Sequence, residues 1–159
     1  MGQRPRLPAA ARGRAARPGA ARGPGAAPLI AVDTGVLIDV IRRVESRAAR
    51  IFRRPAGTGI LAIGDLVLLD VLQGSSTEAR ARGMERRLRS FEVVGMLDDA
   101  LATQAAAHHR RLRESGVTPR STPDLIIATW CIAHAVPLLQ RDRGFGPMAD
   151  HLGLQLVAA

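Results

Sequence analysis

Short apolar runs and longer amphipathic stretches alternate along the chain from Leu29 onward. The runs are rich in Val, Ile and Leu, have the length of buried strands, and read LIAV, GILAI, FEVVGM, PLLQ and LQLV. The stretches between them predict helices over 36–43, 47–54, 65–74, 75–91, 98–116, 122–135 and 144–153. Strands separated by helices predict an α/β fold with a mainly parallel sheet, in which ligands bind beyond the carboxyl ends of the strands.

Polar residues and glycines mark the expected helix boundaries. The first helix is expected to begin after a turn at Thr34 and Gly35. Asp65 is expected to cap the helix that Gly74 ends, and one of the hydroxyl residues at 75–77 the helix after it.

Residues 1–28 lack this alternation. They are biased toward Ala, Arg, Gly and Pro and include six arginines but no acid. This composition is typical of a disordered segment, and the interspersed arginines break the apolar stretch that a signal peptide needs. We therefore predict a disordered tail at 1–28 and one domain at 29–159. The tail is expected to be dispensable, with a transit peptide, an RNA-binding arm or an alternative start near Leu29 as other interpretations.

Composition limits the class of protein. One cysteine, Cys131, excludes an internal disulfide framework and suits a reducing compartment. No apolar stretch approaches the ~20 residues of a membrane span, so a soluble, cytoplasmic protein is expected. The net charge is +9, but the six arginines of residues 1–28 leave only +3 for the remainder, and all 23 basic residues are arginines.

Four aspartates occupy unusual places in this pattern. Asp33 directly follows LIAV and Asp142 follows PLLQR, so both lie at carboxyl ends of expected strands. Asp124 opens a helix, and Asp70 interrupts the apolar run LVLLDVL. Taken singly, the first three are explained as turn, loop and helix-start residues. Asp70 would instead face the interior unpaired.

Together the four carboxylates are explained by a metal ion. Clustered carboxylates raise each other's pKa unless a cation compensates their charge. Ligands that are all oxygen suit Mg²⁺ or Mn²⁺. Zinc is not indicated, because the single cysteine and the four histidines show no ligand spacing.

Three stretches resemble the PIN-domain ribonucleases, in particular the VapC toxins of bacterial toxin–antitoxin pairs. They are VDTGVLIDVIR, DLVLLDVLQG and GVTPRSTPDLIIATWCIAHAVPLLQRDRGF, and successive acids are 37, 54 and 18 residues apart. The resemblance implies a PIN-like three-layer fold and Mg²⁺-dependent endoribonuclease activity. It also implies a homodimer that a VapB-type antitoxin silences. Catalytic and metal-binding roles then fall to Asp33, Asp70, Asp124 and Asp142.

The resemblance also extends to neighbouring residues and has two departures. Thr34 would lie near the metal, and Arg120 and Arg141 near the substrate phosphate; the alternatives are a turn residue and two solvent-exposed arginines. The second acid of the family is normally Glu, whereas this chain has Asp70. The family often has a further acid where this chain has Gly144, which implies a less negative site.

Other classes of protein share parts of this pattern. Receiver domains and haloacid-dehalogenase phosphatases also place an Asp at a strand end, but both rely on a lysine, which this chain lacks. No glycine-rich phosphate loop is present. The remaining alternative is a degenerate PIN domain that binds RNA or a basic partner peptide without cutting.

Overall fold

Four parallel strands form the centre of the molecule. The computed structural model describes residues 28–54 and 60–157. The strands are β1 (Leu29–Val32), β2 (Ile60–Gly64), β3 (Glu92–Val94) and β4 (Leu138–Leu139), in the order β3-β2-β1-β4. The predicted α/β fold with a parallel sheet is confirmed. The predicted tail at 1–28 lies outside the described residues except for Pro28, and the first residue of GILAI also lies outside them.

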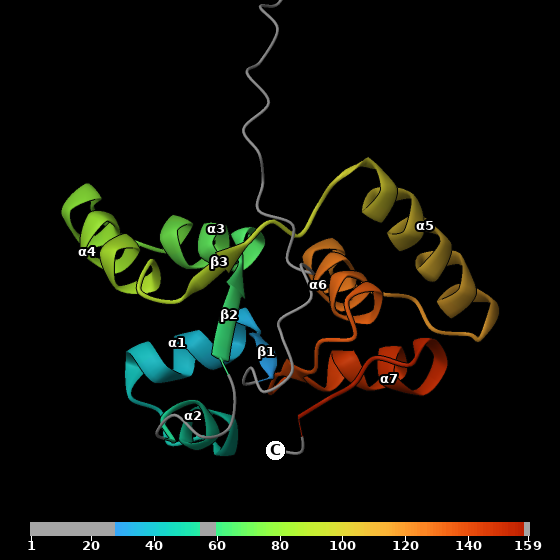
Figure 1. Ribbon diagram of the computed structural model, residues 1–159, viewed down its shortest axis with the longest axis horizontal. Helices are drawn as coiled ribbons and strands as arrows, with labels where there is room; N and C mark the ends of the chain where they lie inside the picture. Colours follow the sequence, from blue (N-terminus) through green and yellow to red (C-terminus); the bar gives the residue numbers. More distant parts are fainter. Residues whose placement is uncertain (1–27, 55–59, 158–159) are drawn as a thin grey trace, which may run out of the picture.

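Helices pack around the sheet in two groups. They are α1 (Thr34–Arg42), α2 (Arg47–Phe52), α3 (Asp65–Gln73), α4 (Glu78–Leu88), α5 (Asp99–Glu114), α6 (Thr122–Ala133) and α7 (Gly146–Leu152), with a 3-10 turn η1 at Arg143–Phe145. Helix α1 packs against α2 and α3, and α3 against α4, whereas α5 packs against α6 and α7. In Figure 1 the first group lies to the left of the strands and the second to the right. None of the described helices is long and apolar enough to cross a membrane.

Three local predictions are wrong. The last apolar run, 154–157, contributes one bridge between Leu138 and Leu156 rather than a strand. Helix α1 begins at Thr34, so Thr34 and Gly35 are helical. Helix α3 begins at Asp65, and its N-cap is Gly64, because β2 runs straight into the helix.

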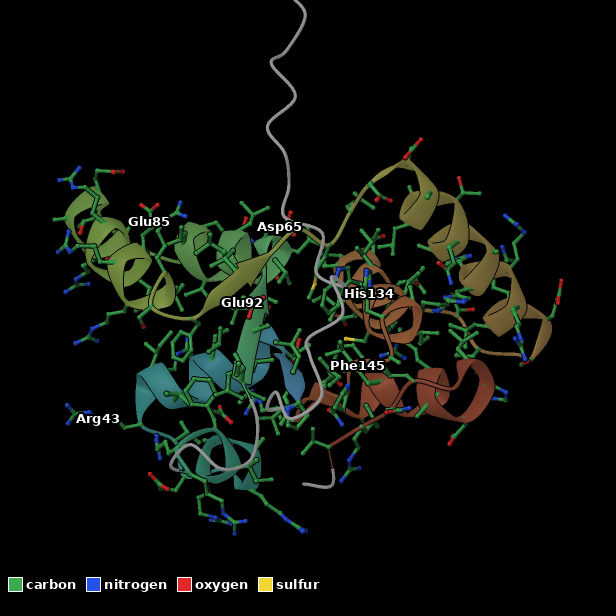
Figure 2. All side chains as sticks on the ribbon, in the orientation of Figure 1. Arg43, Asp65, Glu85, Glu92, His134 and Phe145 are labelled. Atoms are coloured by element: carbon green, nitrogen blue, oxygen red, sulfur yellow. The ribbon has the colours of Figure 1, made fainter. Side chains whose placement is uncertain are left out.

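Asp65 instead joins two segments. Its Oδ1 accepts the N–H groups of Leu66 at 2.9 Å and of Met96 at 3.0 Å, which ties α3 to the residues after β3. A Cβ on Gly64 would lie 2.3 Å from the Met96 sulfur, so the Met96 side chain would have to shift to admit one. In Figure 2 Asp65 lies beside the end of β3, whereas Arg43 projects outward past the end of α1.

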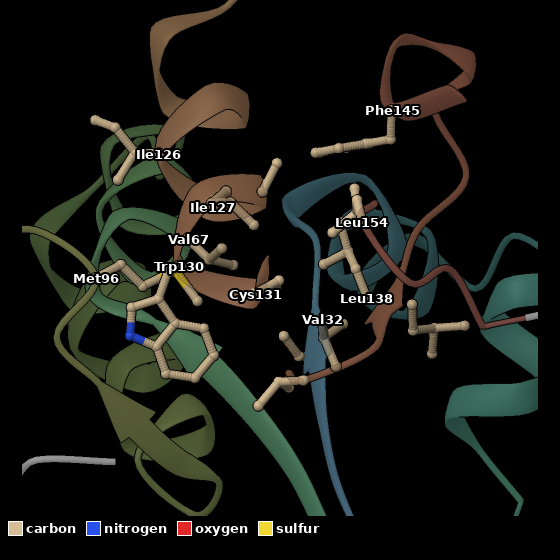
Figure 3. Packing of buried hydrophobic residues seen from close by; sticks show 14 of the residues in the cluster. Val32, Val67, Met96, Ile126, Ile127, Trp130, Cys131, Leu138, Phe145 and Leu154 are labelled. Carbon is tan, nitrogen blue, oxygen red and sulfur yellow. The ribbon is translucent and has the colours of Figure 1, made fainter. Parts of the chain in front are cut away.

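The core is aliphatic around one tryptophan. Helix α6 is buried continuously from Leu125 to Cys131, and Trp130 is 2% exposed. Figure 3 shows this helix facing Val32 and Leu138 of the sheet. Each buried aliphatic side chain stabilises the fold by about 1.5–3 kcal/mol. The packing therefore fixes the start of α6, where Asp124 lies.

The strand order creates a crevice between β1 and β4. The chain adds β2 and β3 on one side of β1 and then returns to place β4 on the other side. Asp33, the first residue after β1, donates its N–H to the carbonyl of Leu139 at the end of β4, 3.0 Å away. Ligands bind at such a reversal of strand order, beyond the carboxyl ends of the strands.

Candidate active site

Asp33 is a buried acid at this crevice. It is the N-cap of α1 and is 5% exposed, and its Oδ2 accepts the N–H of Gly35 at 3.0 Å. An aspartate is preferred at this position because its carboxylate satisfies an otherwise unpaired helix N–H. Burial, together with the nearby carboxylates of Asp124 and Asp142, raises its pKa from 3.8 to about 6, although backbone N–H groups oppose the change.

Asp124 lies in the first turn of α6. Ser121 is the N-cap, and its hydroxyl accepts the N–H of Asp124 at 3.2 Å. Asp124 is thus a first-turn residue and not the N-cap, in agreement with the helix start expected from the sequence. Burial raises the pKa of Asp124, and the carboxylates of Asp142 and Asp70 raise it further, while the hydrogen bond with Ser121 lowers it.

Asp142 is the exposed member of the group. It caps η1, and its Oδ1 accepts the N–H of Gly144 at 2.8 Å. A Cβ on Gly144 would lie 3.3 Å from that same oxygen. The glycine therefore leaves the carboxylate more room than the acid expected from the family resemblance would.

Asp70 is half-buried and paired, which corrects the expectation of an unpaired interior acid. Its Oδ1 accepts from the Gln73 amide at 3.0 Å, and its Oδ2 accepts from the Thr34 hydroxyl at 3.3 Å. The buried face of α3 is formed by Val67 and Val71, so Asp70 lies at the border of that face. Thr34 thereby links the start of α1 to the second acid.

The fold brings all four acids into electrostatic contact. Asp33 is influenced by Asp124 and Asp142, and Asp124 by Asp142 and Asp70. Within residues 28–54 and 60–157, however, no three His, Cys, Asp or Glu side chains form a group that could hold a metal ion as they stand. Magnesium usually takes one or two carboxylates, keeps several waters and shares coordination with a phosphate. The donor set therefore fits an open magnesium site and not a closed protein cage.

A groove of about 470 Å³ is lined by two of these acids. Asp124 and Asp142 lie on it, and so does Arg120, which precedes α6. Arg143, which the sequence analysis did not single out, also lines it. The remaining lining residues are Leu112, Val117, Thr118, Pro119, Ser121, Gly144, Pro147 and Met148. The lining of the groove thus combines carboxylates, guanidinium groups and apolar side chains.

Arg141 is placed differently from Arg120. Its Nη1 lies 2.9 Å from Oδ1 of Asp39, an acid on α1 that is 2% exposed. The sequence analysis missed Asp39, although it interrupts the apolar run VLIDVI much as Asp70 interrupts its own run.

Comparison with known proteins identifies the family to which this chain belongs. The model of the PIN domain family matches residues 30–150. The chain belongs to the PIN domain family. This agrees with the order of the four acidic motifs in the sequence.

Solved structures share this PIN fold. A chain of VapBC2 from Rickettsia felis bound to a DNA fragment from their promoter is 16% identical, with a TM-score of 0.66 over 81% of this chain and 97% of that chain. A chain of VapBC-1 from nontypeable Haemophilus influenzae is 16% identical, with a TM-score of 0.65 over 81% and 96%. A chain of VapBC-5 from Mycobacterium tuberculosis is 19% identical, with a TM-score of 0.61 over 82% and 98%. At these identities the likeness shows the fold.

Proposed function

We propose that this PIN domain is a Mg²⁺-dependent endoribonuclease toxin of the VapC type, which hydrolyses phosphodiester bonds of RNA. The observation that carries the proposal is the electrostatic influence that four carboxylates have on one another: the buried Asp33 is influenced by Asp124 and Asp142, and Asp124 by Asp142 and Asp70. Such a cluster is unfavourable without a cation. The structural likeness to chains of VapBC toxin–antitoxin systems supports the toxin assignment.

The proposed metal ligands are Asp33, Asp124 and Asp142, with Asp70 acting directly or through water, and Mn²⁺ as a substitute for Mg²⁺. When bound, the metal supplies an acidified water for in-line attack and neutralises charge on the phosphate. The Gly35 N–H orients the Asp33 carboxylate, and the Thr34 hydroxyl orients Asp70. These two hydrogen bonds would thus hold Asp33 and Asp70 in place for a bound metal.

The groove beside Asp124 and Asp142 is the proposed path of the RNA. Arg120 and Arg143 line it, and no ion pair of either is found in the described part of the chain. Guanidinium groups bind phosphate oxygens with two parallel hydrogen bonds. Both arginines are therefore proposed to bind phosphates that flank the scissile bond.

The proposed partners are an RNA substrate, a second copy of the chain and a VapB-type antitoxin. The antitoxin is proposed to place a basic side chain among the acids, where it would compete with Mg²⁺. The VapBC structures among the neighbours support an antitoxin partner. The homodimer follows from the family resemblance alone.

Cleavage of a structured RNA with and without metal tests the proposal. We expect cutting in millimolar Mg²⁺, loss of cutting in EDTA, and loss of cutting in Asp124→Asn. The matched control is Asp150→Asn, which removes the same charge from an exposed position on α7 outside the groove. Cutting that continues in EDTA would contradict the metal-dependent mechanism.

A second candidate function is favoured by the absence, within the described residues, of a preformed three-ligand group. In that case the domain is degenerate and binds RNA or a basic peptide without cutting. It would bind RNA with an affinity that Mg²⁺ leaves unchanged, and no cleavage would appear at any metal concentration.

A further inference from the structure

Asp39 is a buried charge that the proposed mechanism does not use. It lies on α1 beside Val36 and Leu37 and is 2% exposed. Its Oδ1 pairs with Arg141, and its Oδ2 has no hydrogen-bond partner among the described residues. A buried carboxylate with an unsatisfied oxygen lowers stability. Its presence on this helix therefore calls for another explanation than fold stability.

The Arg141 side chain, which pairs with Asp39, passes close to Gly35 and Asp33. A Cβ on Gly35 would lie 3.2 Å from Nε and 3.3 Å from Cγ of Arg141, and 3.1 Å from Oδ2 of Asp33. A side chain at Gly35 would therefore crowd both Arg141 and Asp33, which lie on the same side of this glycine. The guanidinium thus lies close to both Asp33 and Asp39.

Among the described residues, Arg141 forms an ion pair with only one of these two acids. Within the described residues its ion pair is with Asp39, at 2.9 Å, and it forms none with Asp33 or Asp142. The Arg141 side chain is 50% exposed, so it can adopt other rotamers without displacing the core. A guanidinium pairs well with a carboxylate that lacks a counter-charge. Asp33 would attract Arg141 if Asp39 did not hold it.

We propose that Asp39 is a positioning residue that holds the Arg141 guanidinium away from Asp33 and Asp142, so that the cation position stays open. The inference rests on the proposed metal-dependent function. Without the charge of Asp39, Arg141 would pair with the site acids and compete with Mg²⁺ from inside the protein. Asp39 would then act on metal binding through Arg141 alone.

Binding of Mn²⁺ alone, measured by the loss of the free-ion signal in electron paramagnetic resonance, tests this. Asp39→Asn keeps the size of the side chain and releases the guanidinium, so we expect about tenfold weaker Mn²⁺ binding. The double variant Asp39→Asn/Arg141→Gln has no guanidinium to release and should return to within about twofold of wild type. Glu45→Gln, which breaks the Arg53 ion pair on another part of the surface, is the matched control and should bind as wild type.

If Asp39→Asn folds poorly, the melting temperature and Mn²⁺ affinity of Arg141→Gln alone still test the inference. This variant leaves Asp39 unpaired and should melt earlier, yet bind Mn²⁺ as wild type. If Asp39→Asn, Arg141→Gln and the double variant lost Mn²⁺ affinity equally, the inference would be overturned. The ion pair of Asp39 with Arg141 would then have a structural role only. Wild-type protein that binds Mn²⁺ and cuts RNA, together with Asp39→Asn of unchanged affinity, would overturn the inference and leave the proposed function intact. Wild-type protein that binds no Mn²⁺ would overturn both.

Discussion

Replacing Asp33 by Asn should stabilise the metal-free protein at neutral pH. The substitution removes a charge that is 5% exposed and lies near Asp124 and Asp142, while Asn caps a helix as well as Asp does. The hydrogen bond from the Gly35 N–H can therefore persist. What changes is the free energy of keeping a carboxylate ionised inside the fold.

The size of the effect follows from the pKa of Asp33. Burial and the neighbouring acids raise that pKa from 3.8 to about 6, so the folded protein keeps its proton to higher pH than the unfolded chain does. The free energy of unfolding therefore falls as pH rises from about 4 to about 6, and stays low above that. The resulting advantage of Asn over Asp grows from about 1 kcal/mol at pH 4.5 to about 3 kcal/mol at pH 7.5.

Urea unfolding in EDTA at these two pH values measures the difference. Asp150→Asn is the control, since its exposed charge should make little difference at either pH. In millimolar Mg²⁺ the advantage of Asp33→Asn should shrink, because the cation compensates the wild-type carboxylate. An Asp33→Asn protein that is no more stable than wild type at pH 7.5, or whose advantage does not depend on pH, would refute the argument.

Four further predictions concern metal, acids, partner and tail. Mg²⁺ or Mn²⁺ should raise the melting temperature by mass action, and Ca²⁺ less so; a response that Asp33→Asn does not weaken would argue against a carboxylate metal site. Asp70→Glu should cut RNA at least as well as wild type and bind Mg²⁺ more tightly, whereas Asp70→Ala should lose cleavage and spare metal-free stability. A destabilised Asp70→Ala that cuts normally would remove Asp70 from the site. Antitoxin affinity, by calorimetry, should fall in Asp33→Asn and Asp124→Asn; unchanged affinity would place inhibition elsewhere. Deleting residues 1–28 should leave stability and cleavage specificity unchanged and flatten the salt dependence of RNA binding; loss of folded protein would contradict a dispensable tail.

The sheet and two of its acids were predictable because their signals are local. Apolar runs of strand length between helical stretches predicted the four strands, and strand ends predicted where Asp33 and Asp142 lie. The run at 154–157 had the same appearance but forms only one bridge, with Leu138. Its pairing depends on what lies opposite, which no local pattern contains.

The two acids inside apolar helical runs were not predictable. Asp39 interrupts VLIDVI, and Asp70 interrupts LVLLDVL, so the two patterns look alike. Asp39 proves buried and pairs with Arg141, whereas Asp70 is half-buried and meets Thr34. Where a helix is apolar on most sides, its periodicity does not indicate which side faces inward. The distinction is made by tertiary packing and by charges distant in sequence.

Under the proposed function, the uncompensated charge at Asp33 links the stability of the fold to the binding of metal and of an antitoxin. Asp33 is buried, Asp124 and Asp142 help to raise its pKa, and no ion pair of Asp33 is found among the described residues. Without metal, the folded protein is therefore less stable above about pH 6 than below about pH 4. A cation that binds these carboxylates should stabilise it, because it compensates their charge. Under the proposed function, three such cations would be Mg²⁺ with a substrate phosphate, a basic side chain of an antitoxin and the protein's own Arg141. Because they would compete for the same carboxylates, a change at Asp39 that frees Arg141 should weaken Mg²⁺ and antitoxin binding together.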